Sequence, residues 1–294
     1  MEKVSLYIPC YNAQGYLKKC LESVLQQTHK IEEVLVIDDG STDKTLEIAR
    51  DYPVKVIRHS RNKGLAAARN TAFRESHNEF IAALDADCVA SAEWLAELMR
   101  CFTNANIAGV GGRLLERNTA GPADKWRARH MTQAWGEDIL YDPPFLYGNN
   151  SVFRKSAVLR AGRYNEEFRT NYEDIDLSER VYWLGLRMVY NPAAIVEHMR
   201  RDTFGSLARS YWLRQWYYLG YHELGRKNAF RRIALRAGGP VECLDTTMDF
   251  LREDLRLKDY GSLLIGAGLA AYCSWQGLKE LFGGVYLSAA RAHV

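Results

Sequence analysis

The sequence predicts an α/β protein built on a mainly parallel sheet. Short apolar runs at residues 4–8, 34–37, 54–57 and 80–84 alternate with segments whose apolar residues recur at helical spacing. Polar or acidic residues follow the first, second and fourth runs, at the strand ends where parallel sheets bind their ligands. With 294 residues, 47% hydrophobic and 26% charged, the chain has the composition of a soluble globular protein and room for an appendage.

The elements of the first half follow from these patterns. The strand at 4–8 is expected to end at Pro9, and a helix with one apolar face follows it. That face consists of Leu17, Cys20, Leu21, Val24 and Leu25. A turn at 38–43 carries Ser and Thr that can cap the next helix. Further helices are expected over 65–73 and after residue 93, and a further strand over 109–115.

Two carboxylates follow the fourth strand, in the sequence Asp85-Ala86-Asp87. Because side chains alternate along a strand, both carboxylates are expected on the same side of the strand end. Two like charges there repel each other, and a divalent cation removes the repulsion. Mg²⁺ and Mn²⁺ prefer carboxylate oxygens and share them with substrate phosphates. The alternative on these residues alone is an acidic turn that caps the helix near residue 92.

Charge, cysteines and the first loop exclude several classes of protein. A net charge of +3 is too small to indicate a nucleic-acid partner. Six scattered cysteines without a Cys-x-x-Cys pair fit reduced thiols in a cytosolic protein. The apolar run at 4–8 is too short for a signal sequence, so export is not expected. Residues 8–12 lack the Gly-x-Gly-x-x-Gly pattern, which disfavours a dinucleotide fold.

An ordered set of motifs in the first 115 residues is similar to one known family. The motifs are residues 4–12 (VSLYIPCYN), 23–28 (SVLQQT), 36–45 (VIDDGSTDKT), 62–70 (NKGLAAARN) and 84–87 (LDAD). In order and spacing they resemble the family 2 glycosyltransferases, which have the GT-A fold. The resemblance implies inverting transfer from a nucleotide-sugar donor, in the first place a UDP-sugar.

The resemblance also implies roles for individual residues. Those expected at the nucleotide sugar are Pro9, Tyr11, Asn12, Asp39, Gly64, Arg69, Asp85, Ala86 and Asp87. Asp39 is expected to accept a hydrogen bond from the base, and Arg69 to reach the nucleotide or diphosphate. Asp85 and Asp87 are expected as ligands of the metal, Mn²⁺ or Mg²⁺, with Asp87 in direct contact and Asp85 bridging toward the ribose. For Asp38 and Ser41, turn and capping chemistry is the competing interpretation.

In the second half, the resemblance implies a catalytic base at Asp174, with Glu173 as its neighbour and Asp176 as the rival. One base must take the proton from the acceptor hydroxyl as that hydroxyl attacks the anomeric carbon. His198 is expected as a third metal ligand. Gly148, Asn149 and Trp135 are expected on the acceptor side. For the aromatic ring of Trp135, core packing is favoured over stacking on a sugar.

The last third of the chain is basic and aromatic. Residues 200–236 hold nine Lys or Arg against two Asp or Glu, a net charge of +7. Residues 261–278 contain no charged side chain, but glycines and polar residues interrupt them. We expect a helical hairpin that lies in solution or at a membrane surface rather than a transmembrane helix. Arginines that clamp the donor diphosphate are the alternative use of these charges.

We therefore expect a glycosyltransferase domain over 1–205, with a nucleotide-binding half (1–115) and an acceptor-binding half (116–205), and a helical extension over 206–294. The acceptor is expected to contain carbohydrate and to be a glycan, a lipid-linked or a protein-linked species. A cytoplasmic protein in peripheral contact with the inner membrane face is expected, without a nucleic-acid partner. A sugar-phosphate nucleotidyltransferase and a non-catalytic binding scaffold are the alternative functions.

Overall fold

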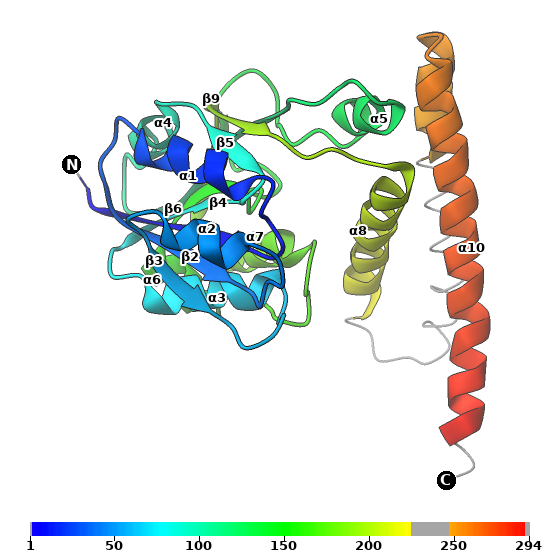
Figure 1. Cartoon of the computed structure of the whole chain (residues 1–294), viewed down its shortest axis with the longest axis horizontal. Coiled ribbons are helices and arrows are strands. Elements are labelled where there is room, and N and C mark those ends of the chain that lie inside the picture. The colour runs from blue at the N-terminus through cyan, green and yellow to red at the C-terminus, as the bar shows by residue number, and fades with distance from the viewer. Residues whose placement is uncertain (1, 225–246, 292–294) are drawn as a thin grey trace. The chain divides into compact units, whose positions relative to one another are not determined.

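The chain folds into two compact units, which the computed structural model describes for residues 2–224 and 247–291. One unit consists of Met1–Arg117 and Thr132–Arg200 and is called the sheet unit. The other consists of Asn118–Met131 and Arg201–Val294 and is called the helical unit. Figure 1 labels the elements of both units.

The sheet unit is organised around one mixed sheet. Among the described residues, nine strands belong to it, in the order β3-β2-β1-β4-β8-β6-β9-β5, with β7 paired to β9. The strands are β1 Val4–Cys10, β2 Ile31–Asp38, β3 Lys55–Arg58, β4 Phe80–Leu84, β5 Cys88–Ala90, β6 Ile107–Glu116, β7 Leu140–Tyr141, β8 Asn150–Arg154 and β9 Arg187–His198. The first four strands run parallel to one another, whereas β8 runs antiparallel to both β4 and β6.

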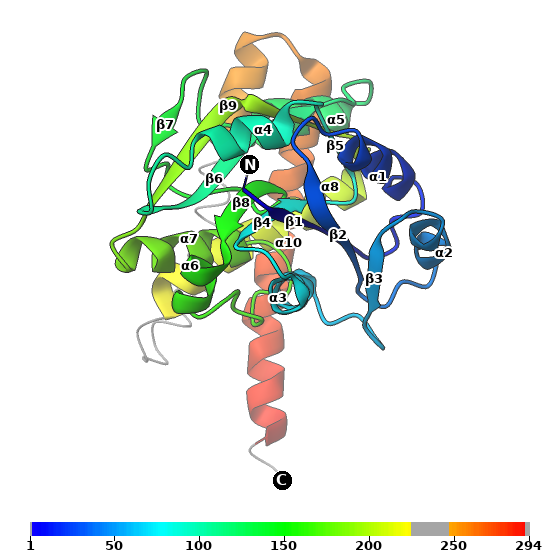
Figure 2. The same ribbon diagram turned by 90° about the vertical axis from the view of Figure 1, so that its left-hand side faces the viewer.

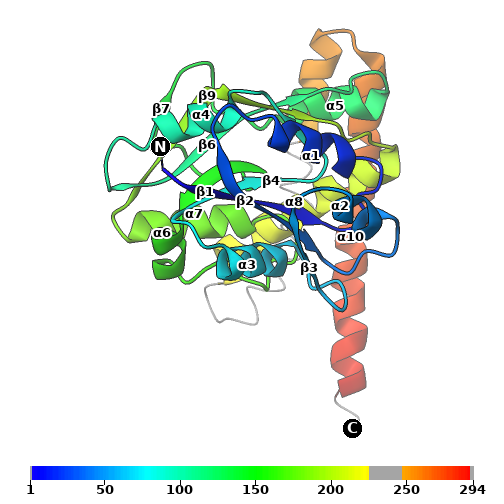
Figure 3. The same ribbon diagram turned by 60° about the vertical axis from the view of Figure 1, so that its left-hand side comes forward.

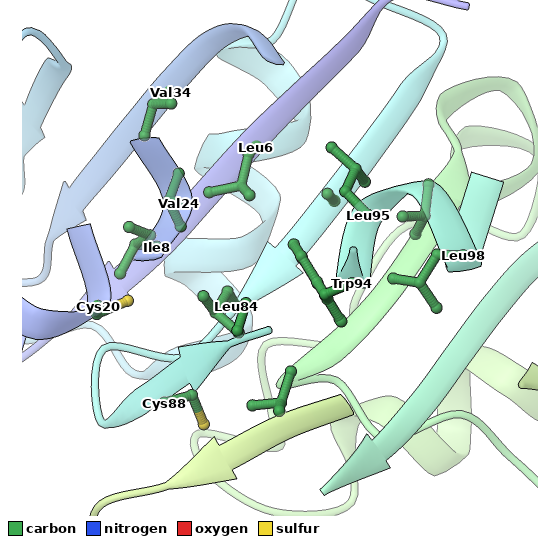
Figure 4. Packing of buried hydrophobic residues seen from close by; sticks show 14 of the residues in the cluster. Leu6, Ile8, Cys20, Val24, Val34, Leu84, Cys88, Trp94, Leu95 and Leu98 are labelled. Atoms are coloured by element: carbon green, nitrogen blue, oxygen red, sulfur yellow. The ribbon is translucent and has the colours of Figure 1, made fainter. Parts of the chain in front are cut away.

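Helices cover both faces of this sheet (Figures 2 and 3). They are α1 Leu17–Leu25, α2 Thr45–Arg50, α3 Leu65–Glu75, α4 Trp94–Arg100, α6 Lys155–Arg160 and α7 Glu173–Trp183. Leu6 and Ile8 of β1 pack into one core with α1 and α4, as Figure 4 shows, while Tyr7 packs into the core on the opposite face with α3. Because both faces are buried, the strands consist of continuous apolar runs rather than alternating residues.

The helical unit has a core of its own. Its labelled helices are α5 Pro122–His130, α8 Phe204–Leu224 and α10 Tyr260–Arg291, and a further helix covers residues 247–256. Trp126, Leu207, Tyr211, Leu269 and Cys273 are buried together in this unit. In the described part of the chain, no helix is both long enough and apolar enough to span a bilayer.

Most expected elements of the first half are present, with corrections at three points. The strand β1 continues through Pro9 to Cys10, because the ladder with β4 ends at Tyr7 and the missing N–H of Pro9 breaks no ladder bond there. Leu25, expected on the buried face of α1, is exposed. The short strand β5 was not expected, because its three residues are too few to show a pattern.

The second half requires larger corrections. The helical hairpin expected at residues 261–278 is one continuous helix, α10. Its glycines permit close packing rather than a turn: a Cβ at Gly266 would lie 2.9 Å from Leu251, and one at Gly268 would lie 2.8 Å from Phe204. The expected domain boundary at residue 205 lies near the observed division after Arg200, but residues 118–131, expected in the acceptor half, contain α5 and belong to the helical unit. Of the basic segment 200–236, the five Lys or Arg that follow Arg214 all lie outside the described residues.

Candidate active site

The loops that follow β1 and β2 are fastened to each other. Ser41 Oγ accepts a hydrogen bond from the Asn12 N–H at 2.9 Å, and Asn12 Oδ1 accepts one from the Thr42 N–H at 2.9 Å. Asn12 adopts a φ of 52°, in the left-handed region that asparagine tolerates better than most residues. The neighbouring Tyr11 is exposed. The expected nucleotide loop therefore has a fixed backbone that presents Tyr11 at the surface.

Asp39 lies buried after β2, where its carboxylate holds the loop that precedes α3. It accepts hydrogen bonds from the N–H groups of Lys63 and Gly64, at 2.9 and 2.8 Å, and from His59 Nδ1 at 2.6 Å. Gly64 has a φ of 101°, and a Cβ there would lie 2.8 Å from the carbonyl oxygen of Arg169. Only glycine fits this position without strain. The expected contact between Asp39 and a nucleotide base stays a prediction.

Arg69 on α3 connects the edge of the sheet with the start of α7. Its buried guanidinium donates to Asp85 Oδ1 at 3.3 Å and to Glu173 Oε1 at 3.4 Å. It also donates to the Gly148 carbonyl oxygen at 2.5 Å and to the Tyr7 hydroxyl at 3.1 Å. A Cβ at Gly148 would lie 2.8 Å from Arg69 Nη2, so this close approach requires glycine. In the structure, four protein groups bond the Arg69 side chain. A direct contact between Arg69 and the donor stays a prediction.

The two carboxylates after β4 lie in different surroundings. Burial raises the pKa of Asp85 above its ordinary value, although the charge of Arg69 opposes this effect. Burial would also raise the pKa of Asp87, but the hydrogen bond and charge of His198 bring it below its ordinary value. Ala86 between them is buried. This difference is compatible with the expected division of labour, in which Asp87 touches the metal directly and Asp85 bridges toward the ribose.

His198 at the end of β9 bridges two carboxylates. Its Nε2 lies 3.2 Å from Asp87 Oδ2, and its Nδ1 lies 2.9 Å from Glu116 Oε2. Burial would lower the pKa of His198, but these two hydrogen bonds raise it to about 9. The ladder pairs His198 with Glu116 of β6 on one side and with Cys88 of β5 on the other. Metal-binding histidines characteristically bond a carboxylate through their second nitrogen, as His198 bonds Glu116.

The expected metal ligands meet only in part. Asp87 and His198 touch, whereas Asp85 is bonded to Arg69. Within residues 2–224 and 247–291, no three His, Cys, Asp or Glu side chains are gathered closely enough to hold a metal ion. Metal ligation by Asp85, Asp87 and His198 therefore stays a prediction.

Three acidic residues open α7, and each has a different environment. Asp174 is half-buried; its Oδ2 accepts a hydrogen bond from the Gly148 N–H at 3.1 Å. Glu173 is buried, and burial together with the charge of Asp174 raises its pKa, although Arg69 opposes the shift. Asp176 is buried and paired with Arg180. Of the two rivals for the base, only Asp174 is partly accessible, and among the described residues it forms no ion pair.

A left-handed turn aims the start of α7. Asn171 and Tyr172 have φ values of 61° and 78°. Two consecutive residues with positive φ are costly for side chains with a Cβ, most of all for an aromatic one. Tyr172 is buried against Phe168, with ring centroids 5.4 Å apart, and this packing holds the strained turn.

The expected acceptor residues lie around Gly148. Asn149 Nδ2 donates to Gln133 Oε1 at 2.8 Å, while its buried Oδ1 has no partner among the described groups. Trp135 Nε1 donates to the Phe145 carbonyl oxygen at 2.9 Å, and its ring stacks on Tyr147 at a centroid distance of 5.7 Å. Trp135 therefore belongs to an aromatic cluster, as the favoured packing interpretation expects, but it remains half-buried. Contact of these residues with an acceptor stays a prediction.

The sequence did not point to Glu116 or His59. Glu116 ends β6 one residue beyond the strand expected from the apolar pattern, at the sheet edge that carries His198. Extending the expected strand 109–115 by one residue would have placed Glu116 at this edge. His59 Nε2 also bonds Thr71 Oγ1 at 2.9 Å, and no local pattern indicates that it supports Asp39.

Known proteins resemble this chain in sequence and in structure. A glycosyltransferase, GlyA, from Streptococcus pneumoniae serotype 4 is 27% identical over 234 residues, which are 73% of this chain and 32% of that protein. A pre-mycofactocin glycosyltransferase from Mycobacterium tuberculosis is 28% identical over 207 residues, which are 67% of this chain and 43% of that protein. The chain thus spans less than half the length of these two curated relatives.

Among solved structures, the mannosyltransferase PcManGT from Pyrobaculum calidifontis, in complex with GDP-Man and Mn²⁺, matches 98% of this chain and 86% of that chain, with a TM-score of 0.62 and 18% identity. At this identity the likeness shows the fold alone, which is the expected GT-A fold. The sequence profile of glycosyl transferase family 2 matches residues 5–162, more than half of the chain. The chain belongs to glycosyl transferase family 2.

Proposed function

We propose that this protein transfers a sugar from a nucleotide-diphosphate donor to a hydroxyl of a carbohydrate-containing acceptor, with inversion at the anomeric carbon. One observation carries the proposal. Arg69 joins Asp85, at the expected donor side, to Glu173, beside the expected base, through a single buried guanidinium. Donor binding and proton removal would then occur on one connected set of side chains.

For the donor we propose a UDP-sugar. Asp39 uses three acceptor positions of its carboxylate on His59, Lys63 and Gly64, which leaves about one of its four lone-pair sites for the N–H of a base. Solved relatives of the same fold are complexes with UDP or with GDP-Man. The nucleobase and the sugar are therefore the first properties that an experiment must determine.

For the general base we propose Asp174. The Gly148 N–H orients its Oδ2, and the Ile175 N–H donates to its Oδ1 at 2.9 Å. An oriented carboxylate can accept the acceptor's hydroxyl proton during attack on the anomeric carbon. Glu173 is too deeply buried to reach an acceptor, so we assign it the support of Arg69 instead. The ion pair of Asp176 with Arg180 makes it the weaker candidate.

For a divalent metal, Mn²⁺ or Mg²⁺, we propose Asp87 and His198 as ligands, with Asp85 as a further carboxylate. The donor set fits the chemistry, since a histidine oriented by Glu116 stands beside an ionised carboxylate. When bound, the metal would supply Lewis-acid stabilisation of the leaving diphosphate. The chain's own residues would hold the donor and orient the acceptor hydroxyl.

On the acceptor side we propose Gly148, Asn149 and Trp135. The buried Oδ1 of Asn149 has no partner among the described groups and could bond a sugar hydroxyl once acceptor binding exposes it, and the half-buried ring of Trp135 offers an apolar edge to a sugar. A glycan, glycolipid or glycoprotein precursor would meet these requirements. We further propose that the helical unit contacts a membrane surface at the cytoplasmic side.

A thermal-shift panel of nucleotide sugars, each with and without Mn²⁺, tests this function. A ligand that binds only the folded state raises its stability, so UDP-sugars should raise the melting temperature, and Mn²⁺ should increase the shift. Hydrolysis of each nucleotide sugar in the absence of acceptor, measured by the release of UDP, identifies the sugar that the enzyme uses. If no nucleotide shifts the melting temperature, the donor proposal is wrong. Synthesis of a nucleotide sugar from a sugar phosphate would instead establish the nucleotidyltransferase alternative.

A further inference from the structure

The outward side of α10 is apolar where a water-exposed helix is normally polar. Its exposed residues between 260 and 276 follow the spacing i, i+4, i+7, i+11 and i+15, which is one side of a helix. They are Tyr260, Leu264, Ala267, Ala271 and Trp275, and we call them the outer face of α10. Tyr260, Leu264 and Trp275 are 63%, 74% and 58% exposed. Because residues 260–276 include no charged side chain, the outer face is continuous.

The opposite side of the same helix already packs into the helical unit. Gly266, Leu269 and Cys273 are buried there. The outer face is therefore not a core surface that has been left open by a poorly packed helix. It is a second apolar side on a helix whose other apolar side is already buried in the core of the helical unit.

Basic residues lie next to the outer face in the chain. Leu255 and Leu257, 58% and 57% exposed, alternate with the exposed Arg256 and Lys258 just before α10 begins. Long basic side chains can lay their methylene groups on an apolar surface and keep their charge at the lipid headgroups. Over its whole sequence the helical unit has 16 Lys or Arg and 10 Asp or Glu, a net charge of +6, whereas the sheet unit has 23 and 26, a net charge of −3.

We infer that the outer face of α10 docks on the surface of an anionic lipid bilayer. An apolar helix side with tyrosine and tryptophan at its two ends matches the boundary between headgroups and acyl chains, which aromatic residues prefer. The positive charge of the helical unit, +6 over its sequence and +3 over its described residues, matches the negative potential of such a surface. A second copy of the chain would bring two units of charge +6 together, which disfavours self-association through this face. The inference rests on the membrane contact proposed above for the helical unit, and it does not depend on sugar transfer.

Vesicle co-sedimentation of the full chain tests this inference. Vesicles of phosphatidylcholine alone are compared with vesicles of an equimolar mixture with phosphatidylglycerol. We expect binding to the mixed vesicles that weakens as salt rises, since salt screens the charges. The double variant Leu264→Glu, Trp275→Glu should bind them at least about tenfold less, because burial of a single large apolar side chain accounts for a factor of this size.

A matched control comes from the sheet unit. Trp183 on α7 is 75% exposed, and Trp183→Glu should bind vesicles as the unchanged protein does. The charge reversal Arg256→Glu, Lys258→Glu provides a second variant that leaves α10 untouched and should also weaken binding.

Four results would overturn the inference: no binding of the unchanged protein to mixed vesicles, equal binding of the two vesicle types, equal loss of binding in Trp183→Glu, or a solution dimer that only the double variant dissociates. The shift in melting temperature on addition of donor nucleotide, measured on the same variants, distinguishes failure of the docking proposal from failure of the donor proposal. If vesicle binding is lost while the donor shift persists, only the docking face is affected.

Discussion

The two units of this protein bury charge for different purposes. In the sheet unit, the buried Arg69 meets Asp85 and Glu173 at the proposed site, and Glu173 Oε2 remains without a partner among the described groups. In the helical unit, the buried Arg127 pairs with Asp202, and neither residue is an expected site residue. The first set joins side chains of the proposed site from separate elements, whereas the second joins α5 to the segment before α8, and Arg127 Nη2 likewise has no partner among the described groups. Buried ion pairs by themselves therefore do not identify an active site.

The same contrast appears at the surfaces. The sheet unit, with a net charge of −3, collects its expected site residues along the strand ends, whereas the helical unit, with +6, exposes an apolar helix side. We interpret the sheet unit as the part that performs chemistry and the helical unit as the part that attaches the protein to a surface. The following predictions test this separation, from the largest expected effect to the smallest.

Asp174→Asn should abolish most of the sugar transfer while donor binding persists. Loss of a general base lowers the rate by about a hundredfold to ten-thousandfold, and the amide keeps the shape of the side chain. The turnover number and the melting shift with donor nucleotide are the two measurements. The control is Asp142→Asn at an exposed loop position paired with Arg187, which should retain full activity. If Asp174→Asn transferred sugar at a normal rate, Asp174 would not be the general base, and Asp176 would be the next candidate.

Arg69→Gln and Arg127→Gln compare the two buried arginines directly. Removal of one partner from a buried ion pair costs about 3–5 kcal/mol, because the remaining carboxylate is uncompensated. Both variants should therefore lower the free energy of unfolding, measured by urea denaturation. Only Arg69→Gln should also weaken donor binding, since only Arg69 contacts Asp85. Equal effects of the two variants on donor binding would contradict the separation of units.

Glu173 should make stability depend on pH in a defined direction. Its pKa is raised from an ordinary 4.5 to about 8, so the folded state holds a proton that the unfolded chain has lost between these values. The free energy of unfolding should thus decrease as pH rises through this window. Glu173→Gln should remove this decrease, so that its stability relative to the unchanged protein is greater at high pH than at low pH. Urea denaturation across the window measures it, and the exposed Glu167→Gln should leave the decrease unchanged.

Glu116→Gln should weaken metal binding without removing a proposed ligand. A carboxylate that orients a metal-binding histidine contributes about 10- to 100-fold to metal affinity. Titration of Mn²⁺, followed by the melting shift in the presence of donor nucleotide, gives that affinity. Glu197→Gln, on the strand that carries His198 but paired with Arg117, is the matched control. An unchanged Mn²⁺ affinity in Glu116→Gln would argue against His198 as a ligand.

The sequence by itself determined the α/β class, the strands at the proposed site and the family. Strand runs that are buried on both faces are apolar throughout, and the acidic turns after them are local features, so periodicity and spacing are sufficient to find them. The motifs around Asp39, Arg69 and Asp85 lie within the first half in a fixed order, which makes the resemblance specific.

Only the tertiary structure decided which side chains meet. Arg69 and Glu173 are 104 positions apart, and His198 and Glu116 are 82 apart, so no local pattern relates them. The helix α5 belongs to the helical unit rather than to the sheet unit that flanks it in sequence. The reason is that the buried ring of Trp126 packs against Tyr211 and Phe250, far along the chain. From the sequence alone, the glycines of α10 indicate a break in the helix. In the structure, neighbouring side chains pack into the space beside these glycines, and the helix is continuous. Local spacing records the preference of a segment, whereas long-range packing decides its partners.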